Sequence, residues 1–224
     1  MQIETKHAER HIRSLSLAKD CAELGARFRT INFVTGLSQR ELNGLFFPDG
    51  TTTPRGRAPD SPDWYHSTNL LNRAEASIFV SIYRRIRDLG FGPPQALVSG
   101  YRHYRSACIL EPRISFDRAF DLASHVDGVW LVKAANFSLL PCPVCSSHYV
   151  AAVSITPVSN HECPFCKLIA RYPRDPRIQT AFPIRDLSDV LSLHSSFLAL
   201  SRHADEFEGP GPTIDDASAT DNHR

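Results

Sequence analysis

The 224-residue sequence contains no apolar run that approaches the length needed to span a bilayer. Its first residues, Met-Gln-Ile-Glu-Thr-Lys-His, lack the apolar core of a secretory signal peptide. The composition, with 42% hydrophobic and 22% charged residues, is ordinary for a soluble globular protein. We therefore expect a cytoplasmic protein without a membrane partner, whose cysteines stay reduced.

Signatures of catalysis are also lacking. The sequence has no nucleophile beside a general base, no paired carboxylates and no phosphate-binding loop. His103, His125 and His194 are scattered through helical segments, without a neighbouring pattern that suggests a catalytic triad. The glycines of Gly90-Phe91-Gly92-Pro93 break a helix and do not match a phosphate-binding fingerprint. We expect no enzymatic activity and no small-molecule substrate.

Lysine is scarce, since the chain has four lysines and 21 arginines. Guanidinium groups make bidentate contacts with phosphate and guanine, so this bias favours nucleic-acid recognition, although a GC-rich genome would also raise arginine everywhere. The charge is uneven as well: residues 203–224 carry a net charge of −5, and residues 1–202 carry +6. Composition therefore permits a nucleic-acid partner without requiring one.

The six cysteines include two C-x-x-C pairs, Cys142/Cys145 and Cys163/Cys166, with 17 residues between them. Two such pairs at this separation fit a tetrahedral thiolate site for one structural Zn²⁺ per chain. Four cysteine ligands fill the coordination shell and leave no position for a catalytic water, so such a site builds a fold. The alternatives are two disulfides, a redox pair, an iron–sulfur cluster or unrelated core cysteines.

Two histidines between the pairs are further candidate ligands, whereas the two remaining cysteines are not. His148 and His161 lie between the pairs and could replace a thiolate, although a place around the ligands or on the surface is the stronger alternative. Cys21 and Cys108 lie in helical patterns, which predicts small buried apolar residues.

Apolar residues at three- and four-residue intervals predict a mainly α-helical, multi-helix protein. The paired cysteines predict that it also has a small C-terminal Cys₄ zinc-ribbon-like module. Strand composition marks residues 149–155, and the apolar run 129–132 is compatible with a strand or a helix. The predicted helices cover residues 5–34, 38–47, 67–89, 93–108, 115–127 and 186–203.

The same patterns divide the chain into four parts. We expect a helical domain at 1–135, which includes a Pro-rich loop at 48–62, and the Cys₄ module at 136–178. A C-terminal helical part follows at 179–203, and the acidic Gly/Pro-containing tail at 204–224 is expected to be disordered.

Residues 26–47 have the ingredients of a helix-turn-helix. A helix at 26–34 leads into a short turn that contains Gly36, and a second helix starts from Ser38. Ser38 and Glu41 have the spacing of a capping box, which predicts the start of that second helix. A plain helical hairpin that packs into the core is the alternative.

The side chains of this element suit DNA readout. Glutamine and asparagine can pair with adenine and arginine with guanine, while arginines on the first helix could brace phosphates or be solvated surface charges. The residues expected to anchor the hairpin are Leu37, Leu42 and Leu45. The candidates for DNA contact are Arg27, Arg29, Gln39, Arg40 and Asn43.

A second basic surface follows the last cysteine. Candidates for phosphate contact beside a rigid zinc module are Lys167, Arg171, Arg174 and Arg177, with Arg185 beyond. A solvated linker is the alternative with equal weight.

Several short sequence motifs occur in a characteristic order between about residue 15 and about residue 175. They are Leu24-Gly25-Ala26-Arg27, Thr35-x-Leu37-Ser38, Asp63-Trp64, Ala76-Ser77, Tyr101-Arg102-x-Tyr104 and the set Cys142/Cys145/Cys163/Cys166. Together they resemble the FlhC family of bacterial flagellar transcriptional activators. Ser146-Ser147 depart from the family pattern, in which glycine is common after the first pair, and this predicts a less tight turn.

The resemblance implies a mostly α-helical subunit with a Cys₄ zinc site that joins FlhD in a heterohexamer. That complex binds promoter DNA upstream of flagellar genes and activates transcription with RNA polymerase. By this resemblance the four cysteines are the zinc ligands, whereas individual DNA contacts do not carry over. A zinc-stabilised protein-interaction scaffold without direct DNA contact is the alternative function.

Overall fold

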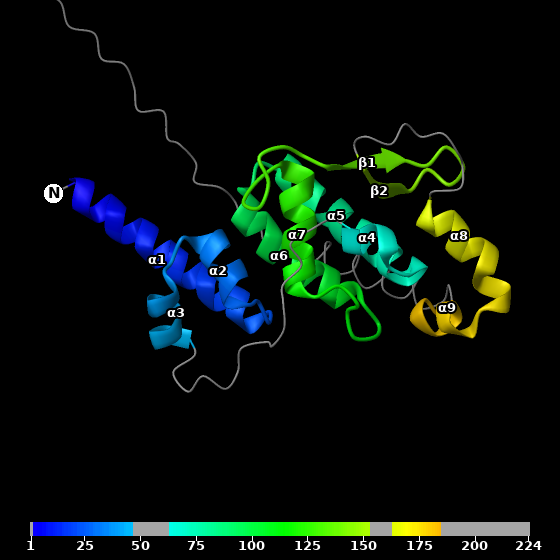
Figure 1. The fold of residues 1–224 in the computed structure, drawn as a ribbon, viewed down its shortest axis with the longest axis horizontal. Helices are drawn as coiled ribbons and strands as arrows, with labels where there is room; N and C mark the ends of the chain where they lie inside the picture. Colours follow the sequence, from blue (N-terminus) through cyan, green and yellow to red (C-terminus); the bar gives the residue numbers. More distant parts are fainter. Residues whose placement is uncertain (1, 47–62, 153–162, 185–224) are drawn as a thin grey trace, which may run out of the picture. The chain divides into compact units, whose positions relative to one another are not determined.

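The computed structural model describes residues 2–46, 63–152 and 163–184. This part of the chain is mainly helical, with a two-stranded antiparallel sheet, and its elements belong to one compact unit, residues 1–182 (Figure 1). No helix in these described ranges is long and apolar enough to cross a membrane. The elements are α1 (Gln2–Glu23), α2 (Phe28–Thr35), α3 (Gln39–Phe46), α4 (Asp63–Ser67), α5 (Leu70–Asp88), α6 (Pro93–Ala107), α7 (Phe116–Asp127), β1 (Phe137–Pro141), β2 (His148–Ala152), α8 (Pro164–Arg171), the 3₁₀ helix η1 (Tyr172–Arg174) and α9 (Pro176–Ala181).

Helices α5, α6 and α7 pack on one another and form the centre of the core (Figure 1). Each has apolar residues at helical spacing, and each buries much of its apolar face against the other two. Aromatic rings join them: Phe79 of α5 lies 6.3 Å from Tyr101 of α6, and Tyr101 lies 5.1 Å from Phe116 of α7, between ring centroids. Asn69 caps α5, because its side chain accepts a hydrogen bond from the backbone N–H of Asn72 at 2.9 Å.

The β1–β2 hairpin is fixed to this core by hydrogen bonds. Leu139 of β1 pairs with Val150 of β2. The carbonyl of Val150 accepts a hydrogen bond from the phenol of Tyr65 at 2.7 Å, and its N–H donates to Oγ of Ser77 at 3.2 Å. The ring of Phe137 packs 5.3 Å from that of Tyr65. The loop that joins the strands therefore starts from a rigid base.

The helix predicted over residues 5–34 is wrong as a single element. α1 ends at Glu23, and α2 begins at Phe28. The interruption occurs because Gly25 adopts a left-handed conformation, with φ of 81°, which glycine reaches without the steric cost of a Cβ atom.

Three predicted helices are confirmed with small changes at their ends. The helix predicted at 67–89 is α5, which starts at Leu70 after the separate short helix α4. Those predicted at 93–108 and 115–127 are α6 and α7.

The apolar run 129–132 forms neither a strand nor a helix. Trp130 has a φ of 56°, and its ring packs 5.1 Å from that of Phe120 of α7. Burial of this large ring against α7 outweighs the strand propensity of its neighbours.

Several predicted segments are only partly described. The strand predicted at 149–155 is observed as β2, and residues 153–155 lie outside the described ranges. Also outside them are the Pro-rich loop at 48–62, Arg185, the helix predicted at 186–203 and the acidic tail at 204–224. The strand β1 and the helices α8 and α9 were not predicted from the sequence.

Candidate metal centre and DNA-contact residues

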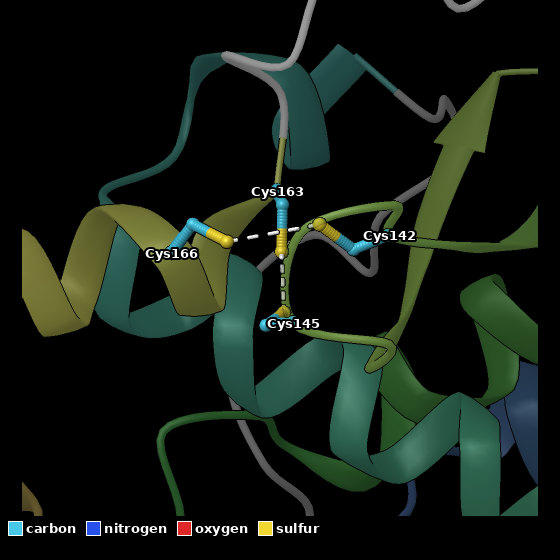
Figure 2. A group of neighbouring side chains, drawn as sticks. All are labelled: Cys142, Cys145, Cys163 and Cys166. Carbon is cyan, nitrogen blue, oxygen red and sulfur yellow. Dashed lines mark hydrogen bonds between the residues drawn. The ribbon is translucent and has the colours of Figure 1, made fainter.

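Four thiols converge between the hairpin loop and the start of α8 (Figure 2). The Sγ atoms of Cys142 and Cys166 lie 3.7 Å apart, and those of Cys145 and Cys163 lie 3.7 Å apart. All four sulfurs lie within 4.8 Å of one another. The two C-x-x-C pairs, far apart in the sequence, are thus brought to one place in a geometry that could hold a metal ion.

These distances suit tetrahedral coordination. With metal–sulfur bonds of about 2.3 Å, tetrahedral angles place two sulfurs about 3.8 Å apart. The remaining cysteines take no part: Cys21 is buried in the core, where burial raises the pKa of its thiol to about 12, and Cys108 is half-buried after α6. His148 is exposed and outside the thiol cluster, and His161 lies outside the described residues.

A tight turn places the first pair. The N–H of Ser146 donates to the carbonyl of Cys142 at 2.9 Å, and the N–H of Cys142 donates to the carbonyl of Ser147 at 2.9 Å. Ser146 has a φ of 59°, a left-handed conformation that costs a residue with a side chain about 1–2 kcal/mol. The turn is closed in spite of the two serines, and Ser146 carries the strain.

The start of α8 places the second pair. Cys163 is the N-cap residue, with an extended backbone, and Pro164 occupies the first helical position, where its missing N–H costs no hydrogen bond. Cys166 follows in the same turn, so both thiols lie at the N-terminal end of the helix. The partial positive charge of that end favours thiolates.

The backbone around the cluster favours ionisation of the first pair. Backbone hydrogen bonds lower the pKa of the Cys142 thiol, and the largest contribution comes from the backbone of Cys145. A hydrogen bond from the backbone of Ser147 lowers the pKa of the Cys145 thiol to about 6. Burial raises the pKa of Cys163, and the adjacent Cys145 thiol raises the pKa of Cys166 to about 12. Four thiolates at this spacing repel one another, so a cation is needed to hold all of them charged.

The two-helix element predicted at 26–47 is observed as α2, a turn and α3. Gly36 closes α2 in a left-handed conformation, with φ of 74°. The capping box is confirmed: the N–H of Ser38 donates to Oε2 of Glu41 at 2.8 Å, and the N–H of Glu41 donates to Oγ of Ser38 at 3.3 Å. Hydrogen bonds from Ser38 lower the pKa of Glu41. That this element reads DNA stays a prediction.

One expected anchor of this element is wrong. Leu37 and Leu42 are buried, as predicted, but Leu45 is 57% exposed. α3 has eight residues, of which Leu42 is buried and Phe46 is partly buried against the main core, whereas Leu45 beside Phe46 stays exposed.

The candidate base-reading residues share one face of α3. Gln39, Arg40 and Asn43 are all exposed. Residues three and four positions apart on a helix are neighbours, so Asn43 lies beside both Gln39 and Arg40. Three side chains suited to base edges are therefore presented together to solvent.

The two arginines of the first helix differ in their surroundings. Arg29 is exposed, with its guanidinium carbon 5.7 Å from the centre of the Phe33 ring. Arg27 is 24% exposed and forms an ion pair with Asp117 at 2.6 Å. Its guanidinium thus holds α2 on α7, a structural role that the local sequence did not indicate.

The basic residues after the cysteines lie along α8 and η1. Lys167 is half-buried, whereas Arg171 and Arg174 are exposed. Arg171 lines a cleft together with Arg177 and with Arg113, which comes from the segment between α6 and α7. Sequence reasoning missed Arg113, because no local pattern joins it to the cysteine-containing segment.

Comparison with known proteins shows one family. The family described as "Flagellar transcriptional activator (FlhC)" matches residues 3–178. The flagellar transcriptional regulator FlhC of Paraburkholderia phymatum is 33% identical over 133 residues, which are 57% of this chain and 57% of that protein. Proteins with the same description from Nitrosomonas eutropha and Proteus mirabilis are 28% and 27% identical over 173 and 168 residues, covering 71% and 72% of this chain and 81% and 82% of theirs.

Proposed function

Because the chain belongs to the FlhC family of flagellar transcriptional activators, we propose that it binds promoter DNA of flagellar genes as one subunit of a complex with an FlhD-like protein. The complex is a heterohexamer in the cytoplasm that recruits RNA polymerase. The observation that carries this proposal is the extent of the family match, because residues 3–178 include both the α2–α3 element and all four clustered cysteines.

The thiol cluster takes one structural Zn²⁺ per chain, with Cys142, Cys145, Cys163 and Cys166 as ligands. Thiolates select soft or borderline cations, and the sulfur spacing agrees with tetrahedral zinc. Such a site contributes about 10 kcal/mol or more of binding free energy to the folded state of its module. Its closed shell offers no position for substrate or water, so no catalysis is assigned to it.

DNA contact is divided between two surfaces. Gln39, Arg40 and Asn43 on α3 supply base contacts, supported by their exposure on one helix face. Arg29 on α2, and Lys167, Arg171 and Arg174 after the last cysteine, supply phosphate contacts. The ion pair of Arg27 with Asp117 leaves that residue a smaller share in DNA binding than Arg29.

A protein-interaction scaffold without DNA contact is the second candidate. Exposed apolar side chains on the first three helices favour it, since Ile12, Phe33 and Leu45 are 64%, 38% and 57% exposed. Such residues suit a protein partner better than phosphates. The FlhD-like subunit accounts for them within the leading proposal.

A salt titration separates the two functions. The chain is co-expressed with the FlhD-like protein of the same genome, and binding to a fluorescent flagellar promoter duplex is measured by anisotropy from 50 to 200 mM salt. Over this range added salt weakens binding that depends on phosphate contacts, by roughly 10³-fold or more for six contacts. Arg40→Ala is expected to reduce the preference for the promoter over an unrelated duplex, with zinc content unchanged. Absence of salt-dependent binding by the intact complex would favour the scaffold.

A further inference from the structure

A small apolar core separate from the main one fixes α8 and α9 against the first turns of α5. Ala74 of α5, Leu168 of α8 and Ile178 of α9 are buried together. Partly buried side chains surround them, among them Leu71 and Phe165. The ends of α8 and α9 therefore have defined positions relative to the start of α5.

Beside this core lies a cleft of about 530 Å³. Three arginines from different segments line it: Arg113 before α7, Arg171 at the end of α8 and Arg177 in α9. Asn69 and Thr180 add polar groups to its wall. A volume of this size accommodates a phosphate with the adjoining sugar, since small-ligand sites start at roughly 300 Å³.

The charge of the cleft is positive. Arg113 is held in place by Glu75, with 3.2 Å between Nε and Oε1. Arg171 and Arg177 are exposed, and within the described part of the chain neither has an acidic side chain at ion-pair distance. Asp175 also lines the cleft, but its carboxylate accepts a hydrogen bond from the N–H of Arg177 at 3.0 Å and caps α9. Among the described residues, Arg171 and Arg177 thus have no acidic partner at ion-pair distance, and Arg113 is held in position beside them, so the cleft can receive an anion.

The thiol cluster and the cleft share structural parts. Cys166 and Arg171 lie on the same helix, α8, five positions apart. Phe165 packs against both the thiol cluster and the small apolar core. Whatever holds the four sulfurs together therefore also sets the position of Arg171.

We propose that this cleft binds one backbone phosphate of promoter DNA, and that the guanidinium groups of Arg113, Arg171 and Arg177 contact its oxygens. The assignment rests on the proposed function and adds a defined anchoring point to it. Guanidinium groups bind phosphate oxygens through paired N–H donors, and a contact to phosphate carries no base information. The cleft thus fixes the register of the complex on the duplex and strengthens binding to all sequences alike.

The test uses the complex with its FlhD-like partner, a flagellar promoter duplex and an unrelated duplex of equal length. The double variant Arg171→Ala/Arg177→Ala should weaken binding to both duplexes by the same factor. It should also make the plot of log affinity against log salt shallower by about one. Arg171→Lys/Arg177→Lys should retain most of the slope, because the charges remain.

Arg85→Ala is the matched control. Arg85 is an exposed arginine on α5, about 24 Å along the helix axis from the cleft end at a rise of 1.5 Å per residue. Its removal should leave affinity and slope unchanged, and zinc content and melting temperature should be equal in all variants.

Three outcomes would overturn the assignment. If the double alanine variant keeps the wild-type slope while the wild type binds the promoter, the cleft is no phosphate site and the proposed function stands. If the wild-type complex shows no salt-dependent DNA binding, both fall. Inorganic phosphate is added at constant ionic strength as a third test. If it raises the melting temperature of the wild type but not of the double alanine variant, and does not displace DNA, the cleft binds a free anion instead.

Discussion

Arg27 donates two hydrogen bonds to Asp117, a residue 90 positions later in the chain. Its backbone N–H lies 3.1 Å from Oδ1, and its guanidinium lies 2.6 Å from Oδ2. The hydroxyl of Thr30 donates to the same carboxylate at 2.6 Å. Asp117, which is 2% exposed, thus caps α2 from α7 and fixes the α2–α3 element on the core.

Asp117→Ala is expected to destabilise the protein by about 3 kcal/mol, the lower end for a broken buried ion pair, because Arg27 is partly solvated. Urea unfolding of the zinc-loaded protein measures this loss. Asp117→Asn is the control, since it keeps an acceptor for the N–H of Arg27 and should cost less. Equal stability of Asp117→Ala and the wild type would show that the cap is not needed.

Asp127 makes stability depend on pH. Burial alone raises its pKa, but hydrogen bonds from Tyr83, Arg87 and Arg84, at 2.7, 2.7 and 2.9 Å, outweigh burial and lower the pKa below its ordinary value of 3.8. A carboxylate with a lowered folded-state pKa stabilises the fold above the unfolded-state value, and this stabilisation disappears as pH falls through the folded-state pKa.

The free energy of unfolding of the wild type should therefore exceed that of Asp127→Asn most at neutral pH, and the difference should shrink below about pH 4. Chemical unfolding of both proteins at pH 6 and at pH 3 tests this, and loss of metal at low pH cancels in the comparison. A difference that stays constant with pH would contradict the role given to Asp127.

Ser146→Gly is expected to strengthen the first cysteine turn. Glycine adopts the φ of 59° without strain, which should gain about 1 kcal/mol, or about fivefold in metal affinity. Competition with a chelator measures the affinity. Ser147→Gly is the matched change: Ser147 has no positive φ, and the variant keeps its backbone hydrogen bond to the Cys145 thiolate but loses the one from its side chain, so affinity should fall. Equal effects of both variants would argue against strain at Ser146.

Phe165→Ala tests whether the thiol cluster and the basic cleft are coupled. Phe165 touches both the cluster and the small core beneath the cleft, but it supplies no ligand. The variant should keep one metal ion per chain and lose DNA affinity without loss of promoter preference. Phe165→Leu, which retains an apolar side chain, should lie close to the wild type. Unchanged DNA affinity in Phe165→Ala would separate the two sites.

The sequence predicted those features that depend on short stretches of chain. The C-x-x-C pairs predicted the thiol cluster, because each pair can direct two sulfurs toward one point. The spacing of Ser38 and Glu41 predicted the start of α3. Features that depend on distant contacts were missed. The separation of α1 from α2 depends in part on Asp117, which accepts a hydrogen bond at the start of α2. The run that contains Trp130 forms no regular element, and the Trp130 ring packs on Phe120.

The arginines of the cleft show the same difference between local and distant features. Arg171 and Arg177 stood out as a basic run beside the cysteines, whereas Arg113 joins them only through the packing of α8 and α9 on α5. The exposure of Leu45 likewise follows from how the short helix α3 packs, with Leu42 buried and Phe46 partly buried, which periodicity does not reveal.

Elemental analysis of protein prepared without oxygen tests the central claim most directly. The account predicts one zinc ion per chain in the wild type. In Cys163→Ala it predicts loss of the metal, together with loss of promoter binding by the complex with the FlhD-like subunit. A wild-type protein that binds the promoter fully while holding no stoichiometric zinc would contradict it.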